Sequence, residues 1–260
     1  TYAAFFGDAL EITPEFTVVA NARYEEMELK RRNLNAEGTL ENNGFERDYD
    51  WVSWRVGGVY KLSDELMTYV QYSDAKDPIN SNILLVNANQ DFDLTDATQF
   101  EIGLKGSWLN GKAESTLAFF DIERDDILER FALDSVTNVG GRTSQGVEFS
   151  SSFMLSDDWR LSASAAYTSA EFQRSANFQQ FAGNTPPNVP ELTANLFTSV
   201  DNIAGLPIEI GASVHYVDDR YGDNANTVTL NAYTLTNLFA VYRSDNYRVT
   251  FNVDNVFDED

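Results

Sequence analysis

The chain has 260 residues, of which 41 are Asp or Glu and 18 are Lys or Arg, so its formal net charge is −23. This charge excludes nucleic acid as a partner, because phosphate recognition needs a basic surface. With 43% hydrophobic and 13% aromatic residues, the sequence is too apolar for a disordered acidic chain. The absence of cysteine excludes disulfides, thiol catalysis and cysteine-ligated metals. We therefore expect a folded protein.

The residues give no sign of catalysis. The single histidine, His215, leaves little room for a histidine metal site or a Ser-His-Asp triad, and we interpret it as structural. No nucleophile-base pair and no pair of carboxylates stands out. We predict a protein that is not an enzyme and that has no cofactor and no metal site.

The hydropathy of the chain limits how it can meet a membrane. No stretch approaches the roughly eighteen apolar residues of a membrane helix, and the first residues lack the pattern of a signal peptide. A transmembrane β-barrel stays compatible with the low mean hydropathy of −0.35, because its apolar residues occupy alternate positions.

Alternation of apolar and polar residues is the dominant pattern along the chain, and it is typical of amphipathic strands. Most of these segments are close to the length of about nine to eleven residues that crosses a bilayer at a tilt. The pattern predicts twelve strands, at residues 2–12, 16–24, 51–61, 66–72, 100–108, 113–122, 146–153, 159–167, 192–200, 208–216, 232–243 and 247–257.

Short and long connections alternate between these segments. Short turns are expected at 13–15, 62–65, 109–112, 156–158, 202–207 and 244–246, and long polar loops at 25–50, 73–98, 123–144, 171–190 and 217–231. The acidic residues crowd into the connections. This order of lengths predicts an antiparallel up-and-down transmembrane β-barrel with tight periplasmic turns and long extracellular loops.

Aromatic residues cluster near the ends of the expected strands, as two interfacial girdles require. They are Tyr24, Trp51, Tyr60, Tyr72, Trp108, Trp159, Tyr167, Tyr216 and Tyr247. If the short turns are periplasmic, both termini of the chain lie on the extracellular side. We therefore expect an internal piece of a larger barrel that lacks at least one strand on each side; a complete twelve-stranded pore is the competing interpretation.

Several segments resemble the later barrel strands of TonB-dependent outer-membrane receptors, especially the ferric-siderophore branch. They are FEIGLKGSWLNGKAESTLAFFDIERDDIL, VGGRTSQGVEFSSSFMLSDDWRLSASAAYTSAEF, NTPPNVPELTANLFTSV, HYVDDRYGDNANTVTLNAYTLTNLFAVY and YRVTFNVDNVFDED. The resemblance covers nearly the whole chain. It implies that residues 1–260 are one partial barrel domain, about 12 strands of a barrel of about 22, corresponding to strands ten to twenty-one, without the plug domain and the closing strand.

Physical reasoning supports two of these matches. In SQGVEF, Gly146 leaves room in the lumen, Glu148 points inward, and Val147 and Phe149 face lipid. In NTPPNVPEL, prolines 186, 187 and 190 end a loop and hold the start of the next strand extended.

The implied function is TonB-dependent uptake of a scarce nutrient, expected to be an iron–siderophore chelate, across the outer membrane of a Gram-negative bacterium. The implied partners are outer-membrane lipid and lipopolysaccharide, the small-molecule ligand, and the TonB complex through the plug region. Cationic, aromatic and amide side chains at the extracellular ends are the expected ligand contacts: Arg142, Arg174, Arg220, Tyr221, Asn224 and Asn226.

Three other interpretations stay open. The barrel could be a passive porin or translocator without TonB coupling. The chain could be a soluble, acidic, β-rich binding domain whose sheets bury their apolar faces against each other. Within the receptor family, the nutrient could be cobalamin, a glycan or another compound.

Overall fold

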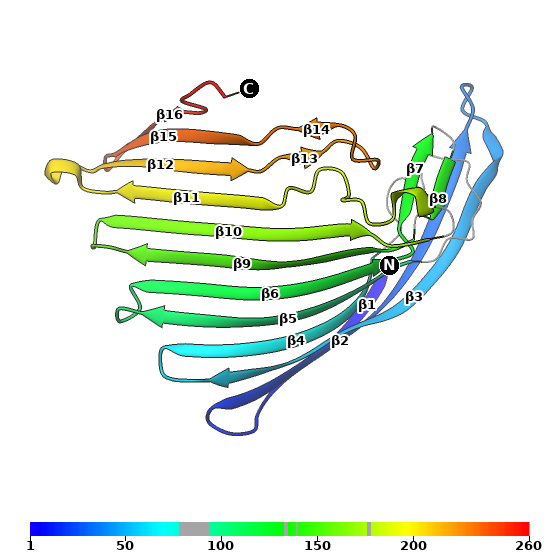
Figure 1. Cartoon of the computed structure of the whole chain (residues 1–260), viewed down its shortest axis with the longest axis horizontal. Helices are drawn as coiled ribbons and strands as arrows, with labels where there is room; N and C mark the ends of the chain where they lie inside the picture. Colours follow the sequence, from blue (N-terminus) through cyan, green and yellow to red (C-terminus); the bar gives the residue numbers. More distant parts are fainter. Residues whose placement is uncertain (78–93, 133–134, 139, 176–177, 260) are drawn as a thin grey trace.

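The computed structural model describes residues 1–77, 94–132, 135–138, 140–175 and 178–259. Twelve of the strands form one curved sheet in the order β1-β2-β3-β4-β5-β6-β9-β10-β11-β12-β15-β16, in which neighbours pair antiparallel (Figure 1). Each strand lies beside the strand of this sheet that precedes it in the chain, which is an up-and-down arrangement. The predicted all-β antiparallel class and the predicted twelve strands are confirmed.

The sheet consists of β1 (Tyr2–Glu11), β2 (Phe16–Leu34), β3 (Leu40–Lys61), β4 (Leu66–Asp77), β5 (Thr95–Trp108), β6 (Ala113–Asp125), β9 (Arg142–Met154), β10 (Trp159–Phe172), β11 (Leu192–Val200), β12 (Ile208–Val217), β15 (Tyr233–Arg243) and β16 (Arg248–Val253). Two short hairpins pair outside it, β7 (Leu128–Ala132) with β8 (Ser135–Asn138) and β13 (Arg220–Tyr221) with β14 (Thr229–Leu230). The 3-10 helices η2 (Gln179–Phe181) and η3 (Ile203–Gly205) each make one turn. Within the described residues, no helix is long and apolar enough to cross a membrane.

Tight turns join the strands at one end of the sheet, which we call the short-turn end. In three of these turns a hydroxyl oxygen accepts the backbone N–H of the third residue ahead, at 3.1 Å each: Thr13 from Phe16, Ser63 from Leu66 and Ser156 from Trp159. The sequences TPEF, SDEL and SDDW share this pattern of a hydroxyl, an acidic third residue and an apolar fourth. These turns lie where the sequence predicts short connections.

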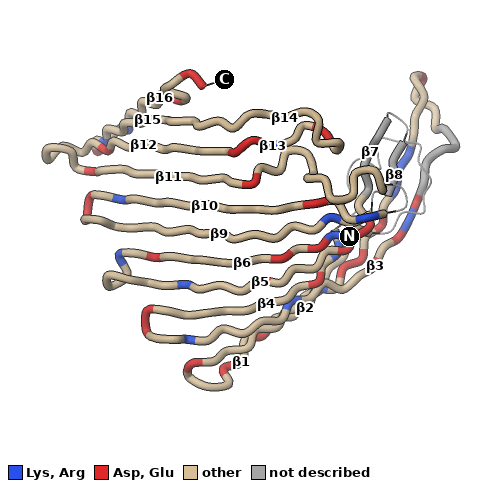
Figure 2. Tube along the Cα trace, viewed as in Figure 1, with Lys and Arg blue, Asp and Glu red and all other residues tan. Residues whose placement is uncertain are grey.

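The longer connections lie at the opposite end, which we call the loop end. Figure 2 shows that acidic residues gather at both ends of the strands and are sparse between them, as expected for connections bathed in water. The predicted loop at 123–144 contains the β7–β8 hairpin, and the loop at 217–231 contains the β13–β14 hairpin. Strands β4 and β5 extend into the predicted loop at 73–98, and its part at 78–93 lies outside the described residues.

The prediction of a long loop at 25–50 is wrong. Strands β2 and β3 stay paired as far as Leu34 and Leu40, and the turn between them is closed by Asn35 Oδ1, which accepts the Thr39 N–H at 2.8 Å. The charges that indicate a solvated loop instead face each other across the ribbon, where Lys30 pairs with Glu46 at 2.9 Å. Cross-strand charge pairs of this kind support a ribbon.

The placement of Trp51 in an aromatic girdle is also wrong. Because β3 begins at Leu40 rather than at residue 51, Trp51 lies in mid-strand, and its side chain is on the face opposite to that of Trp54. Trp51 is 6% exposed and packs with Tyr49 and Leu94. Of the remaining girdle residues Tyr216 is half-buried, and seven are exposed: Tyr24, Tyr60, Tyr72, Trp108, Trp159, Tyr167 and Tyr247.

The last strand is shorter than predicted, since β16 spans Arg248–Val253 rather than 247–257. Asn255 ends it by adopting a positive φ of 49°. The Asn255 backbone N–H donates to Asn237 Oδ1 on β15 at 2.8 Å, and its side-chain amide donates to Glu259 O at 2.8 Å. Asparagine tolerates this left-handed conformation better than most residues.

Candidate ligand-binding surface

The two faces of the sheet differ in chemistry. One row of paired residues crosses five strands with apolar side chains only: Val70, Ile102, Phe119, Val147 and Tyr167. A row on the opposite face is polar: Lys105, Thr116, Ser150, Ser164, Asn195 and His215. We call these the apolar face and the polar face. A sheet with an exposed apolar face and an opposite polar face has the arrangement expected of the wall of a membrane barrel.

The SQGVEF segment is placed as predicted. Val147 and Phe149 are exposed on the apolar face, and Glu148 pairs with Ala118 and Ala166 on the polar face. Gly146 is buried on the polar face, where a Cβ would lie 2.6 Å from the ring of Phe120. The position therefore requires glycine.

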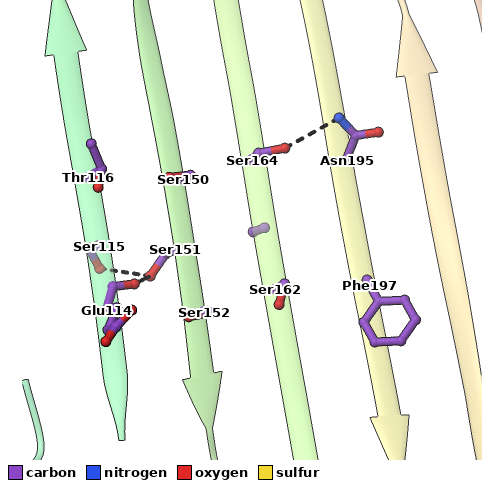
Figure 3. Close-up of a pocket in the computed structure, with 11 residues that line it drawn as sticks. Glu114, Ser115, Thr116, Ser150, Ser151, Ser152, Ser162, Ser164, Asn195 and Phe197 are labelled. Atoms are coloured by element: carbon purple, nitrogen blue, oxygen red, sulfur yellow. Dashed lines mark hydrogen bonds between the residues drawn. The ribbon is translucent and has the colours of Figure 1, made fainter. Parts of the chain in front are cut away.

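A recess of about 360 Å³ opens between β6, β9, β10 and β11 (Figure 3). Most of the residues that line it carry a hydroxyl or an amide group, among them Thr116, Ser150, Ser152, Ser162, Ser164 and Asn195. Asn195 Nδ2 donates to Ser164 Oγ at 3.3 Å. Glu114 is the one charged residue that lines this recess in the described part of the chain. The recess offers hydrogen-bonding groups to a polar molecule, with Glu114 as its one carboxylate among the described residues.

An aromatic pair borders this recess. Phe197 and Phe239 stack with ring centroids 5.8 Å apart and an interplanar angle of 10°. His215 Nδ1 lies 2.6 Å from Asn195 Oδ1, within hydrogen-bonding distance. The His215 and Tyr233 rings pack edge to face, with their centroids 6.2 Å apart. The histidine is thus bound into the wall, in keeping with the structural role predicted for it.

Four charges form a network near the short-turn end of the polar face. Glu209, whose side chain is 8% exposed, accepts hydrogen bonds from Arg160 at 2.8 Å and from Arg243. Both arginines also bind Asp201, at 2.8 Å and 3.2 Å. The network ties β10, the connection after β11, β12 and β15 together.

Arg142, a predicted ligand contact, begins β9 at the loop end. Its guanidinium lies 4.8 Å above the ring of Phe172, which packs edge-on against Phe178 at 5.0 Å. Both phenylalanines are 1% exposed, so they anchor the connections around this arginine.

Arg220 and Tyr221 form the strand β13, which pairs with β14 at the loop end of the molecule. The guanidinium of Arg220 lies 5.5 Å above the ring of Tyr233, the first residue of β15. Arg220 and Arg142 therefore share one arrangement, a cation stacked on an aromatic ring.

Asn224 and Asn226 lie in the turn between β13 and β14 and contact the segment 184–188. The Asn224 backbone oxygen accepts from Asn184 Nδ2 at 2.9 Å, and the Asn226 side chain binds the backbone of Thr185. The structure therefore brings Arg220, Tyr221, Asn224 and Asn226 together in one hairpin.

Arg142 and Arg174 lie outside this hairpin. Arg174 is exposed, two residues beyond the end of β10. Sequence reasoning missed the residues that support the predicted contacts: Phe172 beneath Arg142, Tyr233 beneath Arg220, and Asn184 and Thr185 beside Asn226. The first two residues of the NTPPNVPEL run, Asn184 and Thr185, make the contacts to the hairpin, whereas its pattern points to the prolines.

No group of three or more His, Asp or Glu side chains in the described ranges is placed to hold a metal ion.

Comparison with known proteins agrees with a membrane-barrel wall. Residues 1–256 match the family described as TonB dependent receptor-like, beta-barrel. The chain therefore belongs to the TonB-dependent receptor family, whose members are non-enzymatic proteins of the Gram-negative outer membrane. This assignment rules out the soluble-domain interpretation.

Curated relatives are similar at modest identity. The probable TonB-dependent siderophore receptor PiuA of Acinetobacter baumannii is 27% identical, over 97% of this chain and 36% of the relative. The ferric-pyoverdine BN7/BN8 receptor of Pseudomonas putida is 28% identical, over 100% of this chain and 31% of the relative. The ferrioxamine receptor of Yersinia enterocolitica is 29% identical, over 83% of this chain and 29% of the relative. The chain thus spans about a third of the length of these relatives.

Solved structures share the fold. The siderophore receptor PiuA from Acinetobacter baumannii superimposes with a TM-score of 0.83 at 25% identity, over 98% of this chain and 38% of that chain. The ferric-catecholate import receptor Fiu from E. coli superimposes with a TM-score of 0.80 at 19% identity, over 98% of this chain and 40% of that chain. The match to the receptor barrel is therefore nearly continuous along the chain.

Proposed function

We propose that the chain forms part of the barrel wall of a receptor that takes up a ferric siderophore by TonB-dependent transport. The observation that carries this proposal is the similarity of nearly the whole chain to receptors named for siderophores, namely PiuA, the ferric-pyoverdine receptor and the ferrioxamine receptor. The passive porin is the weaker alternative, because these relatives are receptors.

The loop end, which we take to be extracellular, has chemistry that suits such a ligand. Arginines bind the charged oxygens of a chelate, and aromatic rings orient the guanidinium groups. We propose Arg142, Arg174, Arg220, Tyr221, Asn224 and Asn226 as the ligand-binding set. Since the chain carries a net charge of −23, binding of an anionic chelate depends on these local cations.

The polar face suits passage rather than tight binding. A transported molecule must be bound weakly enough to leave each position along its path. The hydroxyl-lined recess and the aromatic pair Phe197 and Phe239 offer contacts of this kind. We propose that the polar face lines the lumen and that the apolar face contacts membrane lipid, with lipopolysaccharide at the extracellular end. Coupling to TonB would run through a plug domain.

The ligand class is tested by growth under iron limitation. The full-length receptor is expressed in a strain that lacks its other siderophore receptors, and ferric siderophores of the hydroxamate, catecholate and mixed classes are supplied singly as the iron source. We expect growth on at least one of them. Growth on none, together with restored uptake of cobalamin or a glycan, would assign the receptor to another nutrient and contradict the proposal.

A further inference from the structure

The side chain of Asn226 joins two segments that are far apart in the chain. Its Oδ1 accepts the Thr185 N–H at 2.9 Å, and its Nδ2 donates to the Thr185 carbonyl oxygen at 2.8 Å and to the Asp223 carbonyl oxygen at 3.3 Å. An asparagine amide has two N–H donors and one oxygen. All three groups of Asn226 are therefore committed within the protein.

Two further hydrogen bonds cross the same boundary. Asn184 Nδ2 donates to the Asn224 carbonyl oxygen at 2.9 Å, and the Asn188 N–H donates to the Tyr221 carbonyl oxygen at 2.8 Å. The second of these bonds reaches β13 itself. The segment 184–188 and the β13–β14 hairpin are thus fastened at three positions along their length.

The hairpin is also closed from within. Asp223 Oδ1 accepts the Thr227 N–H at 2.8 Å and the Val228 N–H at 2.9 Å, while the Gly222 N–H donates to the Val228 carbonyl oxygen at 2.8 Å. Such a turn moves as a unit when its attachment moves. Asn226, whose side chain makes two of the hydrogen bonds to the segment 184–188, therefore helps to set the position of the whole hairpin.

The hairpin carries Arg220, which has an unusual environment. One of its terminal nitrogens, Nη1, is buried and has no hydrogen-bond partner among the described residues. The guanidinium stays in place through its stacking on Tyr233 and through the fixed position of β13. Because Nη1 is buried, it is closed to a ligand in this conformation, whereas Arg220 as a whole is half-buried. An anionic oxygen of a ligand is a suitable partner for the accessible part of the guanidinium.

We propose that Asn226 is a positioning residue that holds Arg220 over Tyr233, ready to bind an anionic ligand oxygen. The inference rests on the proposed function for the identity of the ligand, but the mechanical link between Asn226 and β13 does not. Asn226 itself has no donor left for a ligand, so its contribution to binding passes through Arg220.

A double-mutant cycle tests this link in the full-length receptor. The variants are Asn226→Ala, Arg220→Ala and the double variant, with Asn231→Ala as the matched control, because Asn231 is an exposed asparagine on the same loop-end connection. The probe is an anionic ferric tris-catecholate carrying radiolabelled iron, and the readout is equilibrium binding to whole cells. Folding of each variant is verified by heat-modifiable gel migration.

The proposal predicts non-additive losses of affinity. Arg220→Ala weakens binding about tenfold or more, as expected for a charge-assisted hydrogen bond, and Asn226→Ala weakens it about fivefold. The double variant binds no more weakly than Arg220→Ala alone, and the control stays within about twofold. If the two losses multiply, Asn226 acts independently of Arg220 and the proposal is overturned.

Hydrogen exchange gives a readout that needs no ligand. The Asn188 N–H bonds to Tyr221 and not to Asn226, so its exchange reports on the seating of β13. We expect Asn226→Ala to speed exchange at Asn188 several-fold, whereas Asn231→Ala leaves it unchanged. Unchanged exchange at Asn188 in Asn226→Ala would overturn the proposal, whether or not the chelate binds. Failure of the chelate to bind the wild type would count only against the proposed function.

Discussion

The ring of Tyr69 lies against Gly103 on the neighbouring strand, so that a Cβ at position 103 would be 2.6 Å from Tyr69 Cε1. From this position the Tyr69 hydroxyl donates to Glu101, and Lys105 Nζ lies 4.8 Å from the ring centroid. A glycine thus seats a tyrosine that organises the polar face between β4 and β5.

Gly103→Ala is therefore expected to displace the Tyr69 ring and to destabilise the barrel by about 1–3 kcal/mol, the usual cost of overpacking. The measurement is the urea concentration at which the refolded full-length barrel loses its heat-modifiable gel migration. Ser107→Ala, an exposed position on the same strand, serves as the control. Equal midpoints for the two variants would show that the tyrosine relaxes without cost.

The charge network at the short-turn end leads to a second prediction. Replacing the buried Glu209 by Ala leaves Asp201 as the acidic partner of Arg160 and Arg243 in the described part of the chain. We expect a loss of about 1–2 kcal/mol, less than for a fully buried pair because both arginines are nearly half exposed. The same unfolding assay measures it.

Asp157→Ala is the matched control for Glu209→Ala. It breaks a single 3.2 Å ion pair with Lys112, and the Asp157 side chain is 93% exposed. Its effect should stay within about 0.5 kcal/mol. A loss for Asp157→Ala as large as that for Glu209→Ala would contradict the role assigned to the network.

A third prediction concerns the ribbon formed by β2 and β3 at the loop end. Trp51→Ala removes a buried indole from the cluster with Tyr49 and Leu94, at a local cost of about 3–5 kcal/mol. Limited proteolysis of intact cells should then cleave the ribbon within residues 25–50 while the barrel stays folded. Trp54→Ala, on the same strand but 40% exposed on the apolar face, should leave the ribbon resistant.

Asp223 gives the β13–β14 hairpin a dependence on pH. A hydrogen bond from the Thr227 hydroxyl and one from the Val228 N–H lower the pKa of Asp223 below its ordinary value. Because the folded pKa is lowered, the stabilisation is complete at neutral pH and is lost as the pH falls below about 4, through the folded pKa. The protection of the Val228 amide, meaning its exchange rate relative to the intrinsic rate at the same pH, should therefore fall as the pH drops through the folded pKa, and Asp223→Asn should abolish this pH dependence of the protection.

The regular part of the fold could be predicted from the sequence because its determinants are local. Alternation identifies each strand of the sheet, and turns such as the one at Ser63 contain their own hydrogen-bonding hydroxyl. The ribbon at 25–50 was missed because its outward charges suggest a solvated loop. The available signal for paired strands was the apolar residue at every second position, at Met27 and Leu29 in one strand and at Tyr49 and Trp51 in the other.

The candidate site was predictable only in part. Residue type singled out Arg220 and Asn226, and the structure places both in one hairpin. The bond between Asn226 and Thr185 joins positions 41 residues apart in separate connections, and no local pattern reveals it. The stacking of Arg220 on Tyr233 likewise depends on how the hairpin folds back onto the sheet.

The most direct test of the account is uptake of radiolabelled iron, supplied as a ferric siderophore that supports growth, by cells that express the full-length receptor with or without TonB. The account predicts that both cells bind the chelate equally at the surface and that only cells with TonB accumulate iron. Equal accumulation in the two strains would mean that the barrel is a passive pore and would contradict the central claim.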